Sequence, residues 1–285
     1  MSTERSIRIY FTAPNISIGV INILVNSFLI YSIWRLKKLQ TISYKLVVVL
    51  SVSDILIGCG LLITEPMFLF AKQDGDIFNV RLVTGIFLYT FCQFSGFMIV
   101  AIAIDRFIHM RYSASYSAIV TKRRAVISVI GIFSFSIALT AAFVCSLKYK
   151  IVFAYYLSLS IITLVSFIVL SALYSAAYIS MQKRTAVVPE RRGRLSIAVN
   201  RNSSQEFYTA VVFILSSLWI CYTPFVIFSA LKYKDTNVER FVLIGFFISE
   251  VLVYANATIN AIVFISFNNH LKSYARNRLR CLENR

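Results

Sequence analysis

Charged residues are scarce in this sequence: Asp, Glu, Lys and Arg together make up 14% of its 285 residues, whereas a soluble domain carries about a quarter. This scarcity excludes an ordinary soluble protein and favours a chain that lies in lipid. The two histidines, His109 and His270, stand isolated in the sequence. With no metal-ligand cluster, glycine-rich nucleotide loop or nucleophile–base pattern, the sequence predicts no enzyme. The five cysteines give no pair on the expected outer loops, so no disulfide is predicted.

The weakly charged part of the sequence is divided into seven long apolar runs. Each run is long enough to cross a bilayer as a helix, which takes about 20 residues. A β-barrel would instead show short segments of alternating hydrophobicity. We therefore predict an all-α membrane protein, folded as one seven-transmembrane helix bundle over residues 1–285. The expected spans are about 12–36, 43–70, 80–110, 123–147, 150–182, 205–231 and 239–265.

Basic residues are divided unevenly between the two sets of loops that connect these spans. One set carries dense clusters such as Lys122–Arg124 and Arg191–Arg194, while the other has fewer basic residues, mixed with acids. The positive-inside rule places the first set in the cytoplasm and the N-terminus outside a plasma membrane. The net charge of +17 follows mainly from this asymmetry, so it does not indicate nucleic-acid binding. A cleavable signal peptide is not expected, because the first apolar run has full membrane length.

Two modification sites are expected close to the membrane surface. Asn15-Ile16-Ser17 is a glycosylation sequon on the expected outer side. Cys281 follows a basic amphipathic stretch after the last span and is a candidate for acylation.

Asp54 lies midway through the second span, where an isolated carboxylate costs about 2.5–3.5 kcal/mol on insertion scales. Oxygen-bearing side chains are expected at a similar depth on other helices, and they suit a small hydrated cation such as sodium or a protonation switch. The alternative is a protonated Asp54 in a hydrogen-bonded packing cluster. The expected neighbours are Asn26, Ser95, Asn256 and Asn260.

Asp105 and Arg106 stand where the third apolar run ends. An acid followed by a base at this position can form an ion pair, and the arginine can change partners between two states. The alternative is a simple charged anchor at the membrane edge.

An ordered set of motifs, most of them on separate spans, resembles the rhodopsin-like (class A) G protein-coupled receptors over nearly the whole chain. The chain resembles the melanocortin-type and adenosine-type branches in three features. These are Arg81 in place of the usual cysteine, Ser166 in place of a proline, and a short loop at 148–150. The resemblance also implies a short amphipathic C-terminal helix at about 267–281 on the membrane surface. The motifs are Asn26, Leu50–Asp54, Asp105–Phe107, Tyr174, Cys221–Pro224 and Asn260–Phe264.

The resemblance implies a mechanism in which Asp105 holds Arg106 at rest. On activation, Arg106 would extend toward Tyr174 as the sixth span pivots at Pro224, and the opened cavity would admit a heterotrimeric G protein. Asn260 and Phe264 would belong to the same switch. Ser204 falls where the family often places a locking acid, so we expect appreciable basal signalling.

Three departures from the family pattern leave other functions open. Tyr222 replaces a tryptophan, Ala261 a proline and Phe264 a tyrosine. A receptor-like chain that signals poorly is therefore one alternative. Seven spans with the intramembrane acid Asp54 could also form a proton- or ion-linked transporter or channel, although the sequence shows no internal repeat.

The residues expected around the ligand combine two acids with aromatic and amide side chains. Glu65 and Glu250 fall near the outer third of neighbouring helices, and buried acids need a counter-charge. A cationic peptide or small cationic molecule is one source of that charge; an internal pair with Arg81 or Lys72 is the other. Leu88 replaces the aspartate of amine receptors, which argues against a biogenic amine. Besides the two acids, the expected pocket residues are Leu88, Tyr89, Gln93 and Tyr222.

Overall fold

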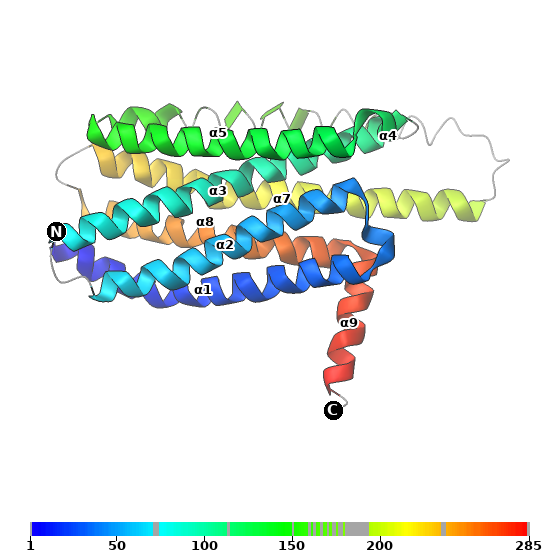
Figure 1. Cartoon of the computed structure of the whole chain (residues 1–285), viewed down its shortest axis with the longest axis horizontal. Coiled ribbons are helices and arrows are strands. Elements are labelled where there is room, and N and C mark those ends of the chain that lie inside the picture. Colours follow the sequence, from blue (N-terminus) through cyan, green and yellow to red (C-terminus); the bar gives the residue numbers. More distant parts are fainter. Residues whose placement is uncertain are drawn as a thin grey trace.

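Long helices running back and forth along one axis form the protein (Figure 1). The computed structural model describes residues 2–70, 74–112, 115–149, 151–158, 194–234 and 238–283, with scattered positions between 161 and 179; some side chains in these ranges are not described. Six described helices are long and apolar enough to span a membrane. They are α1 (Ser2–Arg35), α2 (Ile42–Phe70), α3 (Asp74–Arg111), α5 (Lys122–Lys148), α7 (Arg194–Lys234) and α8 (Arg240–Phe267).

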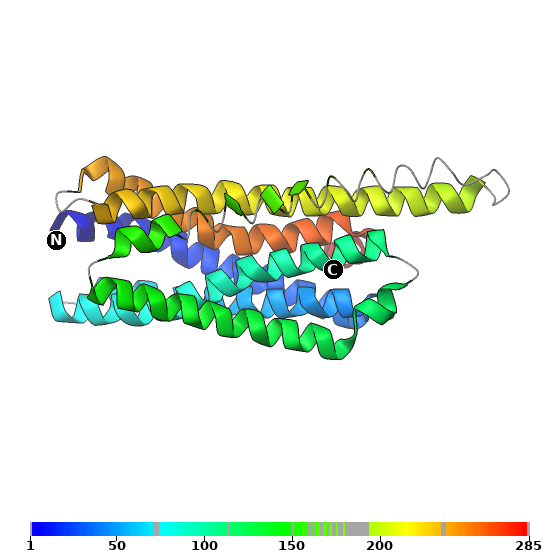
Figure 2. The same cartoon turned by 90° about the horizontal axis from the view of Figure 1, so that it is seen from above.

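These helices follow the expected apolar runs but extend beyond several of them. Helix α1 begins at Ser2 rather than near residue 12, and α7 begins at Arg194 rather than near 205. Of the expected span at 150–182, residues 152–158 are helical and most of the remainder lies outside the described residues. Figure 2 shows α7 extending past the other helices at the end of the bundle where α9 lies.

Three short helices lie at that same end of the bundle (Figure 1). They are η1 (Lys37–Leu39), α4 (Tyr116–Ile119) and α9 (Asn269–Glu283). Helix α9 runs across the bundle axis, and it begins where the Asn268 side-chain oxygen accepts hydrogen bonds from the backbone N–H groups of His270 and Leu271, 3.0 and 3.1 Å away. Such a side-chain cap satisfies donors that have no partner within the helix. Leu271 is buried, while Lys272 and Arg276 are exposed, so α9 has one apolar and one basic face.

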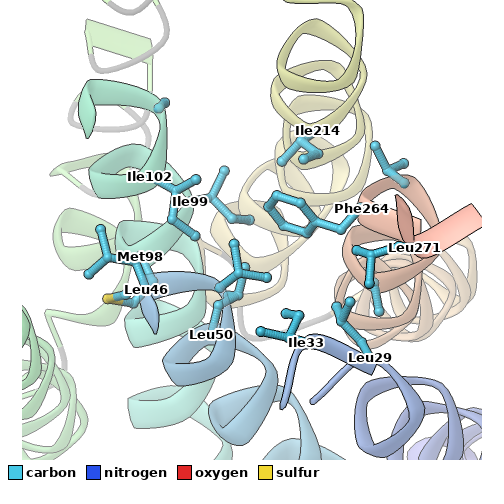
Figure 3. Close-up of a cluster of buried hydrophobic side chains, with 14 of the residues drawn as sticks. Leu29, Ile33, Leu46, Leu50, Met98, Ile99, Ile102, Ile214, Phe264 and Leu271 are labelled. Carbon is cyan, nitrogen blue, oxygen red and sulfur yellow. The ribbon is translucent and has the colours of Figure 1, made fainter. Parts of the chain in front are cut away.

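An apolar cluster fills the centre of the bundle near this end (Figure 3). Leu29 of α1, Leu50 of α2, Ile102 of α3, Ile214 of α7 and Phe264 of α8 belong to it. Leu39 of η1 and Leu271 of α9 belong to it as well, so the cluster holds together the elements that carry the functional side chains. In a soluble protein, burying these side chains would stabilise the fold by about 25 cal/mol per Å² of apolar surface removed from water. In a bilayer the helices are already out of water, so close packing between them contributes more to stability.

Helices α1 and α2 approach each other closely at two glycines. A Cβ atom at Gly58 would lie 2.8 Å from the backbone oxygen of Gly19 and 2.8 Å from Cγ1 of Ile23. Small residues allow this approach between membrane helices. This close packing places the beginning of α1 beside the end of α2.

Candidate functional site

Asp105, near the end of α3, is held by two neighbours as well as by Arg106. The Ser43 hydroxyl of α2 donates to Asp105 Oδ2 at 2.6 Å, and the Tyr116 hydroxyl of α4 donates to Asp105 Oδ1 at 2.7 Å. Burial raises the pKa of Tyr116, so this hydroxyl keeps the proton that it donates. Arg106 Nε lies 3.7 Å from Asp105 Oδ2, which makes this the longest of the three contacts. The carboxylate is therefore fixed mainly by α2 and α4.

Arg106 also faces an aromatic ring. Its guanidinium carbon lies 5.3 Å from the centre of the Tyr44 ring on α2, within the range of a cation–π interaction. The Tyr44 hydroxyl is hydrogen-bonded to the Asn268 side-chain amide, and Asn268 joins α8 to α9. The arginine is thus linked through Tyr44 to the far end of α8.

Asp54 lies near the middle of the bundle with no exposure to solvent. Ser95 donates to its Oδ1 at 2.7 Å, while Oδ2 has no hydrogen-bond partner among the described residues. The Asn260 amide lies beside this carboxyl group, yet neither polar atom of Asn260 forms a regular hydrogen bond with a described residue. Asn256 lies on the same helix as Asn260, and its Oδ1 accepts a hydrogen bond from the Ser217 hydroxyl at 3.3 Å.

The oxygen atoms around Asp54 suit a small hard cation. Asp54 Oδ2 and Asn260 Oδ1, which have no hydrogen-bond partner among the described residues, are buried, and such ions prefer oxygen ligands. Sodium would be held by these two side chains together with Ser95, and it would neutralise the carboxylate.

Tyr222, Pro224 and Phe264 occupy distinct environments along α7 and α8. The Tyr222 hydroxyl donates to the backbone oxygen of Cys92 at 3.0 Å, which ties α7 to α3. Pro224 lies inside α7, where it removes one backbone donor. Phe264 is buried in the apolar cluster near Ile214 (Figure 3).

Glu65 of α2 and Glu250 of α8 are bridged by Arg8 of α1. One guanidinium nitrogen of Arg8 lies 2.7 Å from Glu65 Oε1, and the other lies 2.8 Å from Glu250 Oε2. The Asn15 side-chain amide also donates to Glu65 Oε1, at 2.9 Å, and the Tyr254 hydroxyl donates to Glu250 Oε1, at 3.0 Å. We call this group of Arg8, Asn15, Glu65, Glu250 and Tyr254 the arginine clasp. Its counter-charge is internal and comes from Arg8; the side chains of Arg81 and Lys72 lie outside the described residues.

A cavity of about 320 Å³ lies beside the clasp at the end of the bundle where α1 begins. Its volume falls at the lower end of the range for small-molecule sites, about 300–1,000 Å³. Tyr89 stacks on Phe143 in its wall, with ring centres 4.5 Å apart, and Lys232 forms an ion pair with Glu4 at 2.9 Å. The wall is mainly apolar and aromatic and includes Leu88, Tyr89, Phe143, Phe246, Glu250 and Tyr254.

A sequence profile described as "7 transmembrane receptor (rhodopsin family)" matches residues 25–264. The chain belongs to this family. The receptor is 32% identical to the human adenosine receptor A2a over 137 residues, which cover 46% of this chain and 32% of that protein. It is 33% identical to the horse adenosine receptor A2a over 130 residues, or 44% of this chain and 30% of that protein. The chain thus matches about a third of the length of these A2a relatives. A match to the sheep adenosine receptor A3 is 23% identical and spans 89% of this chain and 84% of that protein.

Membership of this family confirms several predictions made from the sequence. The receptor is a multi-pass membrane protein with a seven-helix bundle, and it is not an enzyme. The adenosine receptors agree with the adenosine-type branch.

The structure places three of the six expected pocket residues on the cavity wall: Leu88, Tyr89 and Glu250. The other three expected residues do not line this cavity. Glu65 is fully buried in the clasp, the Gln93 amide donates to the Tyr155 hydroxyl at 3.1 Å, and Tyr222 binds the backbone at Cys92.

Asn15 is buried in the structure. It lies inside α1 with 1% of its surface exposed, and its amide nitrogen, the atom that a glycan would modify, donates to Glu65. This placement contradicts an exposed glycosylation site. Tyr174 and the side chains of Cys281 and Ser204 lie outside the described residues.

Sequence reasoning missed Arg8, Ser43, Tyr44, Tyr116 and Asn268. Arg8 lies in a polar stretch before the first apolar run, and the other four are polar residues near helix ends, among other polar residues. None belongs to a motif with a recognisable spacing.

Proposed function

We propose that this receptor sits in the plasma membrane with its N-terminus outside, binds an extracellular ligand in the cavity and activates a heterotrimeric G protein. The uneven division of basic residues between the loops supports this orientation. It places the clasp and cavity on the outer side and Arg106 on the inner side. Ligand binding and G protein coupling then take place at opposite ends of one bundle.

The arrangement of Asp105 and Arg106 carries this proposal. Arg106 forms an ion pair with Asp105 at 3.7 Å and faces the Tyr44 ring, and it belongs to α3, which reaches the inner end of the bundle. An arginine in this position can exchange partners when α7 moves. The contacts of Asp105 with Ser43, which is buried, and with Tyr116, which is partly buried, fix the acid that pairs with Arg106 at rest.

A cationic peptide or small cation remains our proposal for the ligand. Glu250 lies on the cavity wall, and an incoming cation would compete with Arg8 for its carboxylate. Adenosine is the second candidate, because the similar receptors carry that name and the aromatic wall suits a flat ring.

Dose–response curves in cells that carry a G protein reporter would separate the two ligands. Glu250→Gln is expected to reduce the potency of a cationic peptide about tenfold or more, because a charge-assisted hydrogen bond contributes about 1.5–3 kcal/mol. Glu239→Gln, at the exposed start of α8, is the matched control. A cationic peptide whose potency is the same in both variants would contradict the cationic proposal, and a response to adenosine alone would favour the second candidate.

We also propose that a sodium ion at Asp54 stabilises the resting receptor. Asp54 would supply the charge, and Ser95 and Asn260 would supply neutral oxygens. Their burial keeps bulk water from screening that charge.

A further inference from the structure

Arg8 occupies the place that a positively charged ligand would take. Only 9% of its surface is exposed, and its two terminal nitrogens reach two carboxylates on different helices. Glu65 is fully buried, and its second oxygen has no hydrogen-bond partner among the described residues. Two carboxylates share one cation, so the acids would carry a large desolvation cost if Arg8 left without a replacement.

The shape of this site selects a guanidinium group. The planar fork of arginine can donate to two carboxylates at once, whereas the ammonium group of lysine is a compact point charge. Phe247 adds an aromatic face 5.4 Å from the guanidinium carbon of Arg8. Asn15 donates a hydrogen bond to Glu65, and Tyr254 donates one to Glu250, so both carboxylates are held in position. The acids are therefore arranged in advance for a flat cation.

Helix α8 connects this site to Arg106. Glu250 lies on α8, and the same helix ends at Asn268, which is hydrogen-bonded to Tyr44 beneath Arg106. Because a helix of 28 residues moves largely as a rigid element, its position at the clasp affects its position at Tyr44. In the structure, the closed clasp coexists with Arg106 in contact with Asp105.

We propose that Glu65 and Glu250 form a guanidinium-binding site that Arg8 fills from within the chain, and that the filled site stabilises the resting receptor. The effect on signalling rests on the function proposed above, whereas the binding site does not. A cationic ligand would act by displacing Arg8. Arg8 thus serves as a tethered ligand that opposes activation.

Thermal unfolding of the purified full chain tests the binding site without any signalling. In Arg8→Ala, methylguanidinium is expected to raise the Tm, because it fills the vacated position and neutralises the two acids. Methylurea has the same shape without the charge and is expected to leave the Tm unchanged. Wild type is expected to show no response, since Arg8 already fills the site. Equal shifts in wild type and variant, or equal shifts with methylurea, would overturn the proposal.

Ligand-free guanine-nucleotide exchange tests the effect on signalling. Arg8→Ala is expected to raise exchange about fivefold or more, the lower end of typical coupling between distant sites, and methylguanidinium should reverse the increase. Arg240→Ala removes an exposed arginine from the start of α8 and should match wild type. Exchange in Arg8→Ala at or below the wild-type rate would overturn the proposed stabilisation of the resting state.

A triple variant keeps the test decisive if Arg8→Ala does not fold. Arg8→Met with Glu65→Gln and Glu250→Gln removes the clasp without leaving a buried charge. It is expected to show raised exchange and no Tm response to methylguanidinium. Exchange equal to wild type, or a Tm response that survives in this variant, would overturn the proposal. If no variant and no wild-type sample promotes exchange, the proposed receptor function fails, while the Tm experiment still decides the binding site.

Discussion

Replacing Tyr116 with phenylalanine should raise basal signalling, because it removes one of the two hydrogen bonds that fix Asp105. The bond from the Tyr116 hydroxyl to Asp105 Oδ1 is 2.7 Å long and has a charged acceptor. Such bonds contribute about 1.5–3 kcal/mol when fully buried. Tyr116 is only half-buried, so water replaces part of the lost contact and we take about 1 kcal/mol as the net loss. If the bond exists only at rest, the balance between resting and active receptor shifts about fivefold.

The assay is ligand-free nucleotide exchange at matched receptor amounts. Tyr112→Phe removes a hydroxyl from an exposed tyrosine near the same loop and is the control. Ser43→Ala removes the other hydrogen bond to Asp105 and should act in the same direction. Exchange in Tyr116→Phe that equals the Tyr112→Phe rate, or falls below it, would refute the role given to Asp105.

Three further changes test other parts of the structure. Gly58→Val should lower the Tm, because its Cβ would overlap the Gly19 carbonyl oxygen and overpacking typically costs about 1–3 kcal/mol; a wild-type Tm would show that α1 and α2 do not pack this closely. Tyr44→Ala should raise basal exchange, since it removes both the ring that faces Arg106 and the hydroxyl bound by Asn268; reduced exchange at normal expression would count against that link. Asp54→Asn should abolish any rise in Tm with sodium, a rise worth about 1.4 kcal/mol at ten times the Kd; an unchanged sodium response would place the ion elsewhere.

The helices could be predicted because membrane spans leave a strong record in the sequence. Long apolar runs mark α2, α3, α5 and α8 to within a few residues at most of their ends. Asp54 and its partner Ser95 could also be predicted, since a polar residue inside such a run stands out and must be satisfied by a neighbour at the same depth. The contact between Asp105 and Arg106 follows from their adjacency.

The clasp could not be predicted, because nothing local marks it. Arg8 lies in a stretch of mixed polarity before the first apolar run, and α1 extends through this stretch and packs against α2 and α8. The partners of Arg8 are 57 and 242 residues away in the chain. The sequence required a counter-charge for Glu65 and Glu250, but only the fold identifies which of several basic residues supplies it.

The roles of Tyr116 and Asn268 were hidden for a related reason. Each follows the end of a long helix, where a single polar residue is ordinary. Their effect depends on the angle at which α4 and α9 leave the bundle, and hydrophobic patterns do not encode that angle.

Nucleotide exchange by purified receptor and purified G proteins of several families tests the central claim most directly. We predict that the wild-type chain accelerates exchange on at least one family without added ligand, and that Arg106→Ala, folded and at the same concentration, does not. A wild-type rate that equals the Arg106→Ala rate for every G protein, with and without ligand, would contradict the proposal that Arg106 transmits a signal in this receptor.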